Sequence, residues 1–423
     1  MAAGLAYAGQ AHDSVKVAAV ALAVVIGLAG AALAVLRFEA FLLALFAVRP
    51  VLDSFKNGGT SNLAPSTAVG LVFLLAGSLW LVARHRAGRL HRPAGTSVAM
   101  VALTVAGFLS VFASREPANS LGAALKLASG LLMFLVLEQV VLDDTRRLRP
   151  LYVATCVVTI VSSVVAIGGS ALHVATIDGR ARGLFVHEND LAQFTVTVAL
   201  LMLALRPHLH GALRRLTTVA LVLAVPALYL TYTRSAWIGF VLGVLVIGIL
   251  QDRRVAVGVL VAVAAAVIFV PGVGNRFSDL SHPQVQGAGD PNSLVFREQY
   301  WKEIAGFANS TPVLGIGLSM VERSTPLALP PHNTPLQIWL ETGAVGSAAF
   351  LWVAGGITRD LRRSARGLPP GLSRGWAVGA CGATVAFGVQ MLSDNLLLQA
   401  LQLWYLALAV APALALRRVS LRA

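Results

Sequence analysis

Arg234 is a charged residue inside a long apolar segment, residues 216–250, that contains no other formal charge. A single helix of that length would overshoot the hydrocarbon core of a bilayer, which is about 30 Å thick. The segment therefore predicts two short spans folded back at residues 231–235. A guanidinium at such a turn is costly unless it faces a polar cavity or an anion, so Arg234 predicts an anion-binding site at one membrane face.

Two further arginines, Arg180 and Arg182, lie in a loop that precedes another apolar segment. Because a guanidinium binds phosphate with two parallel hydrogen bonds, both predict contact with a phosphate group; simple solvation of the loop is the alternative. His187, Glu188 and Asp190 follow, but their spacing lacks the second helical histidine of a zinc site. We therefore predict no metal site here.

His332 stands directly before Asn333, Thr334 and Pro335, a sequence typical of a helix start. The partial positive charge of a helix N-terminus favours a nearby anion. Imidazole can take a proton from a hydroxyl group near neutral pH, so His332 is a candidate general base; a hydrogen-bonding loop histidine is the alternative. Glu341, about two turns further on, must be paired or line a polar cavity.

The segment 296–308 has the pattern of an amphipathic helix. The apolar residues that recur at helical spacing are Phe296, Tyr300, Ile304 and Phe307. Such a helix either lies on the membrane interface or packs on the bundle as a lid. Arg297 could then face the same cavity as Arg234. Asp394, in the polar break at residues 393–395, could pair with an arginine or simply belong to a turn.

The composition requires that these residues be held by membrane-spanning helices. The chain has 423 residues, 57% of them hydrophobic and 12% charged, and its mean hydropathy is +0.76. A soluble domain could not bury that much apolar surface, so we predict an all-α polytopic membrane protein with 12 or 13 spans. The expected spans are residues 16–36, 38–50, 66–83, 96–113, 120–142, 151–172, 191–205, 216–233, 235–250, 255–271, 335–354, 376–396 and 397–416.

The arginines divide the loops into two alternating sets. The net charge of +14 is concentrated in short loops, which the positive-inside rule explains without nucleic-acid binding. The basic loops, predicted to be cytoplasmic together with the C-terminus, are residues 85–92, 143–149, 206–215, 252–254 and 359–374. The loops predicted to lie outside are residues 114–119, 173–190, 231–235, 272–334 and 393–395. We expect one integral domain over residues 1–423, with a large extracytoplasmic loop carrying short helices at residues 272–334; the orientation of the N-terminus stays open.

Four stretches, in this order, resemble motifs of the O-antigen ligase and O-antigen polymerase superfamily of bacterial envelope glycosyltransferases. They are Arg182-Gly183-Leu184-Phe185 with Asn189-Asp190-Leu191-Ala192; Thr233-Arg234-Ser235-Ala236; Arg297 and Trp301 followed by Pro312 and Gly315-Ile316-Gly317; and Pro331-His332-Asn333 followed by Leu336, Glu341, Gly343 and Gly346.

The resemblance implies a multi-pass enzyme of the bacterial inner membrane that uses neither a metal nor another cofactor. Its donor would be a glycan on a polyprenyl diphosphate carrier, and its acceptor a hydroxyl of a glycan, lipid or wall component on the extracytoplasmic side. By position, His332 would activate that hydroxyl, with inversion at the anomeric carbon. The resemblance implies diphosphate contacts by Arg182, Arg234 and Arg297, with Arg180, Asn333, Glu341 and Asp394 as possible supporting residues.

Two other interpretations stay open. A flippase or transporter of an anionic lipid-linked substrate would also need buried arginines, together with a polar path to both faces. A wall-glycan polymerase with an acidic catalytic residue could use Asp279, Asp290 or Glu298. No P-loop, dinucleotide-binding motif or serine nucleophile motif is present in the sequence.

Overall fold

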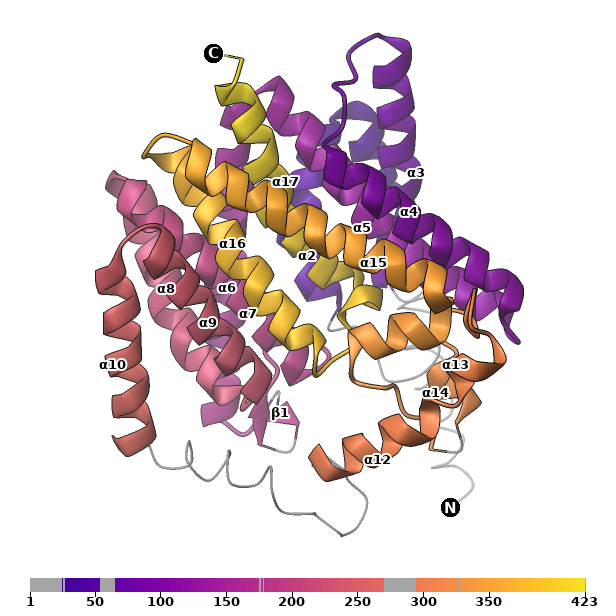
Figure 1. The fold of residues 1–423 in the computed structure, drawn as a ribbon. Helices are drawn as coiled ribbons and strands as arrows, with labels where there is room; N and C mark the ends of the chain where they lie inside the picture. The colour runs from indigo at the N-terminus through magenta and orange to yellow at the C-terminus, as the bar shows by residue number, and fades with distance from the viewer. Residues whose placement is uncertain are drawn as a thin grey trace, which may run out of the picture.

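The computed structural model describes residue 25 and residues 27–53, 65–174, 176–177, 179–269, 294–325 and 327–422. These residues form a bundle of helices with one small β-hairpin (Figure 1). The first predicted span and the segment 270–293 of the large loop lie wholly or partly outside the described residues.

The long helices are α2 (Phe38–Asp53), α3 (Pro65–Arg86), α4 (Gly95–Ser110), α5 (Pro117–Asp143), α6 (Leu148–Ala171), α7 (Glu188–Leu205), α8 (Gly211–Leu230), α9 (Arg234–Leu250), α10 (Arg253–Phe269), α15 (Thr334–Gly367), α16 (Leu372–Met391) and α17 (Ala400–Ser420). Three short helices belong to the large loop: α12 (Leu294–Ile304), α13 (Phe307–Ser310) and α14 (Val321–Ser324). Single 3₁₀ turns are η1 (Val111–Ala113), η2 (Thr145–Arg147), η3 (Arg206–His208) and η4 (Leu396–Leu398). The hairpin pairs β1 (Thr176–Ile177) with β2 (Arg180–Ala181) in antiparallel register.

Eight helices within the described residues are long and apolar enough to cross a membrane, and two more apolar helices, Gly27–Leu36 and α9, are shorter. The predicted class, an all-α polytopic membrane protein, is confirmed. The fold-back within residues 216–250 is also confirmed, since α8 ends at Leu230 and α9 begins at Arg234.

Two predicted span boundaries are wrong. The span predicted to end at residue 354 continues to Gly367, because arginine and leucine favour helix and the first proline follows only at Pro369. The polar break predicted at residues 393–395 is confirmed as part of a turn at residues 392–399, but α16 already ends at Met391 and α17 begins only at Ala400, so the two spans do not meet at residues 396 and 397. Polar groups of this turn bond to the start of α15 instead of extending a helix.

Close packing at the centre of the bundle depends on small residues. Where α9 crosses α16, a Cβ added to Gly239 would lie 3.0 Å from the carbonyl oxygen of Ala386, so only a small side chain fits. Almost every residue of α7 is buried. On α7, Phe194 packs edge-on against Tyr405 of α17, with ring centroids 4.7 Å apart. This packing makes α7 the central helix, and its first turn lies among the loops described below.

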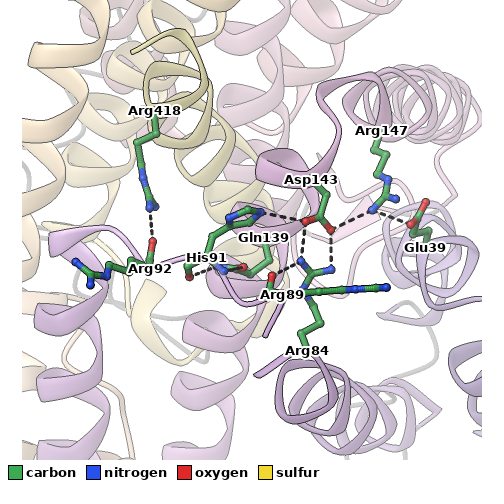
Figure 2. Close-up of polar contacts among 9 residues, drawn as sticks. All are labelled: Glu39, Arg84, Arg89, His91, Arg92, Gln139, Asp143, Arg147 and Arg418. Atoms are coloured by element: carbon green, nitrogen blue, oxygen red, sulfur yellow. Dashed lines mark hydrogen bonds and ion pairs between the residues drawn. The ribbon is translucent and has the colours of Figure 1, made fainter. Parts of the chain in front are cut away.

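The two sets of loops lie at opposite ends of the bundle (Figure 1). At the arginine-rich end, Asp143 accepts hydrogen bonds of 2.6 Å from both terminal nitrogens of Arg84 and lies 3.4 Å from Arg147 (Figure 2). Nearby, Arg418 of α17 lies 2.7 Å from the fully buried Glu138 of α5. The candidate site lies at the other end, with the hairpin and α12–α14.

Candidate functional site

His332 occupies the turn immediately before α15. The predicted helix start is confirmed: Asn333 is the N-cap, its side chain accepts a hydrogen bond of 3.0 Å from the amide of Leu336, and Pro335 lies in the first turn. The φ angle of His332 is +46°, a left-handed conformation that is uncommon for a residue with a side chain. About a third of the side chain, 35%, is exposed, so the imidazole is accessible at the surface of the site.

Asp394 lies beside His332 and connects three segments. Its Oδ1 is 3.9 Å from Nδ1 of His332, and its Oδ2 accepts a hydrogen bond of 2.6 Å from Gln193 of α7. Its backbone carbonyl accepts a hydrogen bond of 2.6 Å from the hydroxyl of Thr334. Among the described residues, the charged partner of Asp394 is this histidine, so the suggested pairing with an arginine is wrong. At 3.9 Å the carboxylate is within ion-pair distance of a protonated imidazole but beyond hydrogen-bond distance.

Arg297 reaches the same turn from α12. Its Nη1 donates a 3.3 Å hydrogen bond to the carbonyl oxygen of Ser393, the residue before Asp394. The side chain is half-buried. The structure therefore confirms that Arg297 points toward the bundle, where it shares one turn with His332.

Arg180 binds the turn between α8 and α9 to the start of α7. Its Nε donates to the carbonyl of Thr231 at 2.9 Å, and its Nη2 donates to Asn189 and to the hydroxyl of Thr233, both at 3.0 Å. The guanidinium also pairs with Glu188. These acceptors belong to the protein, so the structure makes Arg180 a residue that positions the turn.

Arg234 follows Thr233 directly and is half-buried at the first residue of α9. Beside it, the rings of Tyr229 and Trp237 stack with centroids 5.6 Å apart. Aromatic side chains of this kind mark the interface between membrane and water. The arginine therefore begins α9 next to an aromatic pair at the site end of the bundle.

One face of α7 joins these two groups of residues. Asn189 contacts the Arg180 side, and Gln193 contacts Asp394. Residues four positions apart on a helix lie on the same face in successive turns, about 6 Å apart. The segments that carry Arg234, Arg297 and His332 thus lie at one end of α7.

Arg182 differs from Arg180 in its partners. It is half-buried, and its side chain makes no hydrogen bond or ion pair with any described residue. The next residue, Gly183, has a φ of +57°, and a Cβ there would lie 2.9 Å from the carbonyl oxygen of Ser162 in α6. The loop is therefore packed tightly against the bundle, while the Arg182 guanidinium is left for another acceptor.

Glu341 is not brought together with His332 and the arginines. Its buried carboxylate accepts hydrogen bonds from the amide of Val321 at 3.3 Å and from Gln337 at 3.1 Å. It is paired, as its position in an apolar helix requires, but its partners hold the loop before α14. The structure therefore gives it a role in loop packing.

A break in α15 explains the glycines of the large loop. At Gly343, φ is +62° and ψ −157°. The amides of Ala344 and Val345 bond to the carbonyls of Pro312 and Val313, while the carbonyls of residues 340 and 341 accept from the amides of residues 316 and 317. The loop thus satisfies the backbone groups that the break exposes, which a membrane environment demands. A Cβ at Gly315 would lie 2.3 Å from the backbone of Glu341, so the loop needs glycine there.

The lid interpretation of the amphipathic segment agrees with the structure. Tyr300 and Ile304 are buried against Val321 and Leu340, so this apolar face contacts protein and not lipid. Burial raises the pKa of Tyr300, whose hydroxyl donates to the carbonyl of Leu329. The indole nitrogen of Trp301 donates a hydrogen bond of 2.7 Å to the carbonyl of Pro331. α12 therefore supports the peptide that carries His332. The helix ends at Ile304 and not at residue 308.

An apolar cavity of about 230 Å³ lies between α4, α5, α15, α16 and α17. Its wall includes Met391 and Leu397, which flank the turn that carries Asp394, and it extends toward Ile357 and Val410. The cavity thus begins beside the candidate site and continues into the apolar part of the bundle.

Three residues of the site were not predicted: Asn189, Gln193 and Thr233. Gln193 is an amide side chain inside an apolar span, a signal that could have identified it. Of the three acidic residues of the alternative interpretation, the structure describes only Glu298. Glu298 is exposed and pairs with Lys302 at 2.7 Å, and Asp279 and Asp290 lie outside the described residues.

The fold and the site together define a membrane-embedded protein with an imidazole, a carboxylate and several guanidinium groups at one end of a helical bundle. Residues 219–351, less than a third of the chain, match the family model described as O-antigen ligase. This match supports the O-antigen ligase and polymerase superfamily that the sequence motifs indicated, and with it a glycosyltransferase-like activity. The matched region contains Arg234, Arg297 and His332; Arg182 and Asp394 lie outside it. No curated protein matches the chain significantly.

Proposed function

We propose that this protein transfers a glycan from a polyprenyl diphosphate carrier to an acceptor hydroxyl on the extracytoplasmic face of the bacterial inner membrane. The observation that carries the proposal is that two side chains meet at the turn at residues 393–395. His332 lies beside Asp394 of this turn, and Arg297 donates a hydrogen bond to the carbonyl of Ser393. A base and a cation therefore meet at one place.

In the proposed reaction, His332 takes the proton of the acceptor hydroxyl as its oxygen attacks the anomeric carbon. The bond from that carbon to the diphosphate oxygen breaks, and the electron pair leaves with the diphosphate. Direct attack inverts the configuration of the anomeric carbon. Asp394, 3.9 Å from the imidazole, stabilises the imidazolium that forms.

Negative charge develops on the departing diphosphate, and Arg182, Arg234 and Arg297 are proposed to stabilise it. Preorganised cations can do this without a metal ion, and removal of one such donor typically costs about 3–4 kcal/mol. The guanidinium of Arg182, which has no partner within the described part of the chain, fits this role. If activity disappears with a chelator and returns with a divalent ion, the proposal that arginines stabilise the diphosphate without a metal is contradicted.

The prenyl tail is proposed to enter the apolar cavity beside Leu397. A transporter would instead need a polar path between the two ends of the bundle. The cavity that extends from the site is lined mainly by apolar residues, which favours transfer at one face over transport.

The test is the analysis of envelope glycans in a strain that lacks the gene. Single repeat units accumulating on the carrier would indicate a polymerase, and full-length polymer on the carrier would indicate a ligase. A strain with unchanged envelope glycans and no carrier-linked intermediate would contradict the proposal.

The His332→Ala variant tests the assignment of the base. It should reach the membrane at normal levels and lose about 10²- to 10⁴-fold of the transfer rate, the usual contribution of a positioned base. His187→Ala is the matched control, because His187 is exposed at the same end of the bundle, and it should keep most of the activity. Full transfer by His332→Ala would remove this residue as the base.

A further inference from the structure

A cleft of about 920 Å³ lies at the arginine-rich end of the bundle, between the second half of α15 and the end of α17. Five arginines line it: Arg359, Arg362, Arg363 and Arg366 from α15, and Arg417 from α17. The four on α15 are spaced so that they lie on one face of the helix. The positive-inside rule explains arginines at a membrane face, but not their gathering around one cleft.

Most of these guanidinium groups lack an acidic partner. Arg359 is neutralised by Asp360, whose Oδ1 lies 2.9 Å from its Nε, and Thr96 donates to the same carboxylate at 2.6 Å. The side chains of the other four arginines make no hydrogen bond or ion pair with the part of the chain that the structure describes. Asp360 also attracts the nearby Arg363, which leaves Arg362, Arg366 and Arg417 without an acidic partner among the described residues. Three such cations around one concave surface create a positive potential that favours an anion.

An apolar surface continues from the arginines toward the middle of the bundle. Leu351, Ala354 and Gly355 line the same cleft, and Leu351 is 68% exposed. A Cβ added to Gly355 would meet no atom within 4 Å, so the surface is open there. Cations at the rim with exposed apolar residues deeper in the membrane match a lipid, which has a charged headgroup and acyl chains, better than a soluble anion.

We propose that this cleft binds an anionic phospholipid of the leaflet at the arginine-rich end. Its phosphate is held by Arg362, Arg366 and Arg417, and an acyl chain lies along Leu351 and Gly355. Basic pockets between membrane helices recognise lipid headgroups by this chemistry. The site lies at the opposite end of the bundle from His332, so its test is separate from that of glycan transfer.

The test is thermal unfolding of the purified full chain in neutral detergent, with added phosphatidylglycerol, phosphatidylcholine or glycerol phosphate. Phosphatidylglycerol alone should raise the unfolding midpoint. In the double variant Arg362→Gln/Arg366→Gln, the lipid concentration that gives half the effect should rise roughly 10- to 30-fold. The control, Arg214→Gln/Arg215→Gln, removes the same charge from the exposed start of α8 and should respond like the unchanged protein.

A second variant tests the cleft without a change in charge. Gly355→Leu places a side chain where the acyl chain is proposed to lie, and should weaken the response to phosphatidylglycerol while the lipid-free midpoint is retained. Gly122→Leu, at an equally open glycine of α5, should have no such effect. An equal response to phosphatidylcholine, an equal response to glycerol phosphate alone, or an unaltered lipid response in the arginine double variant would each overturn the proposal.

Discussion

The conformation of His332 shows how strongly its surroundings hold it. A left-handed backbone at a residue with a side chain costs about 1–3 kcal/mol and persists only when neighbouring contacts require it. Here Trp301 holds the carbonyl before it and Asn333 caps the helix after it. The imidazole is therefore directed by contacts from α12 and α15 together.

If Asp394 acts through His332, the two residues should be non-additive. Asp394→Asn retains an acceptor for Gln193 but not the negative charge, so transfer should fall, and by less than in His332→Ala. The double variant should be no slower than His332→Ala alone, because groups that act as a unit are lost together. The measurement is the transfer rate of each purified variant with a lipid-linked donor. If the fold-losses of the two single variants multiply in the double variant, Asp394 acts independently of His332.

Arg234 should not tolerate replacement by lysine. An ammonium keeps the charge but not the two-pronged geometry that fits a diphosphate, so Arg234→Lys should lose about 10²- to 10³-fold of kcat. Arg215→Lys, exposed at the arginine-rich end, serves as the matched control. Wild-type kinetics in Arg234→Lys would reduce the role of this residue to charge placement.

At the scale of elements, the break in α15 is the feature that shapes the site end. The loop at residues 312–317 replaces the hydrogen bonds that the helix gives up at Gly343. The carboxylate of Glu341 accepts a further bond from the amide of Val321, where α14 begins. Because α12 packs on α14 and α15 through Tyr300 and Ile304, the break and the lid stabilise one another.

Gly343→Ala should therefore destabilise the protein. Its Cβ would lie 2.4 Å from the backbone of Val313 at a positive φ, and we expect a loss of at least about 2 kcal/mol from strain alone. Gly355→Ala is the matched control in the same helix, where an added Cβ has open space and should be neutral or slightly stabilising. Thermal unfolding in detergent compares them, and indistinguishable midpoints would argue against a rigid break.

At the scale of the whole molecule, the two ends of the bundle differ in their chemistry. The arginine-rich end is held by ion pairs that join α3 to α5 and η2 to α2 (Figure 2), and by a further pair between α17 and α5. The site end has the ion pair of Arg180 with Glu188 and is held mainly by hydrogen bonds from side chains to loop carbonyls, donated by Trp301, Thr334 and Arg297. Fixed ion pairs at one end thus anchor the helices whose other ends present the site.

The pair between Arg418 and Glu138 tests this anchoring. Arg418→Ala would leave the fully buried Glu138 without its cation, and breaking a buried pair on one side costs about 3–5 kcal/mol. Arg422→Ala, exposed a few residues later, is the control and should be near neutral. The measurement is the denaturation midpoint of each variant. If the two midpoints are similar, the hydrogen bond from the amide of Ala94 is enough to satisfy Glu138 without Arg418.

The sequence alone determined the helical class, the fold-back at Arg234, the cap of α15 and the order of the family motifs. Each depends on residues close together in the chain, such as hydropathy over one span or Asn333 followed by a proline. The extension of α15 to Gly367 was not predicted, although it follows from local helix propensity up to Pro369. The end of α16 depends on partners elsewhere, since the turn at residues 392–399 is stabilised by Thr334.

Only the tertiary structure decided which polar groups already have protein partners. Arg180 and Arg182 are two positions apart and were equivalent candidates, yet Arg180 is bound to Thr231, Thr233 and Asn189 while Arg182 has no partner among the described residues. Glu341 proved to belong to loop packing, and Asp394 to His332. The physical reason is that a hydrogen-bond partner is set by which distant segments pack together, and the local sequence does not contain that information.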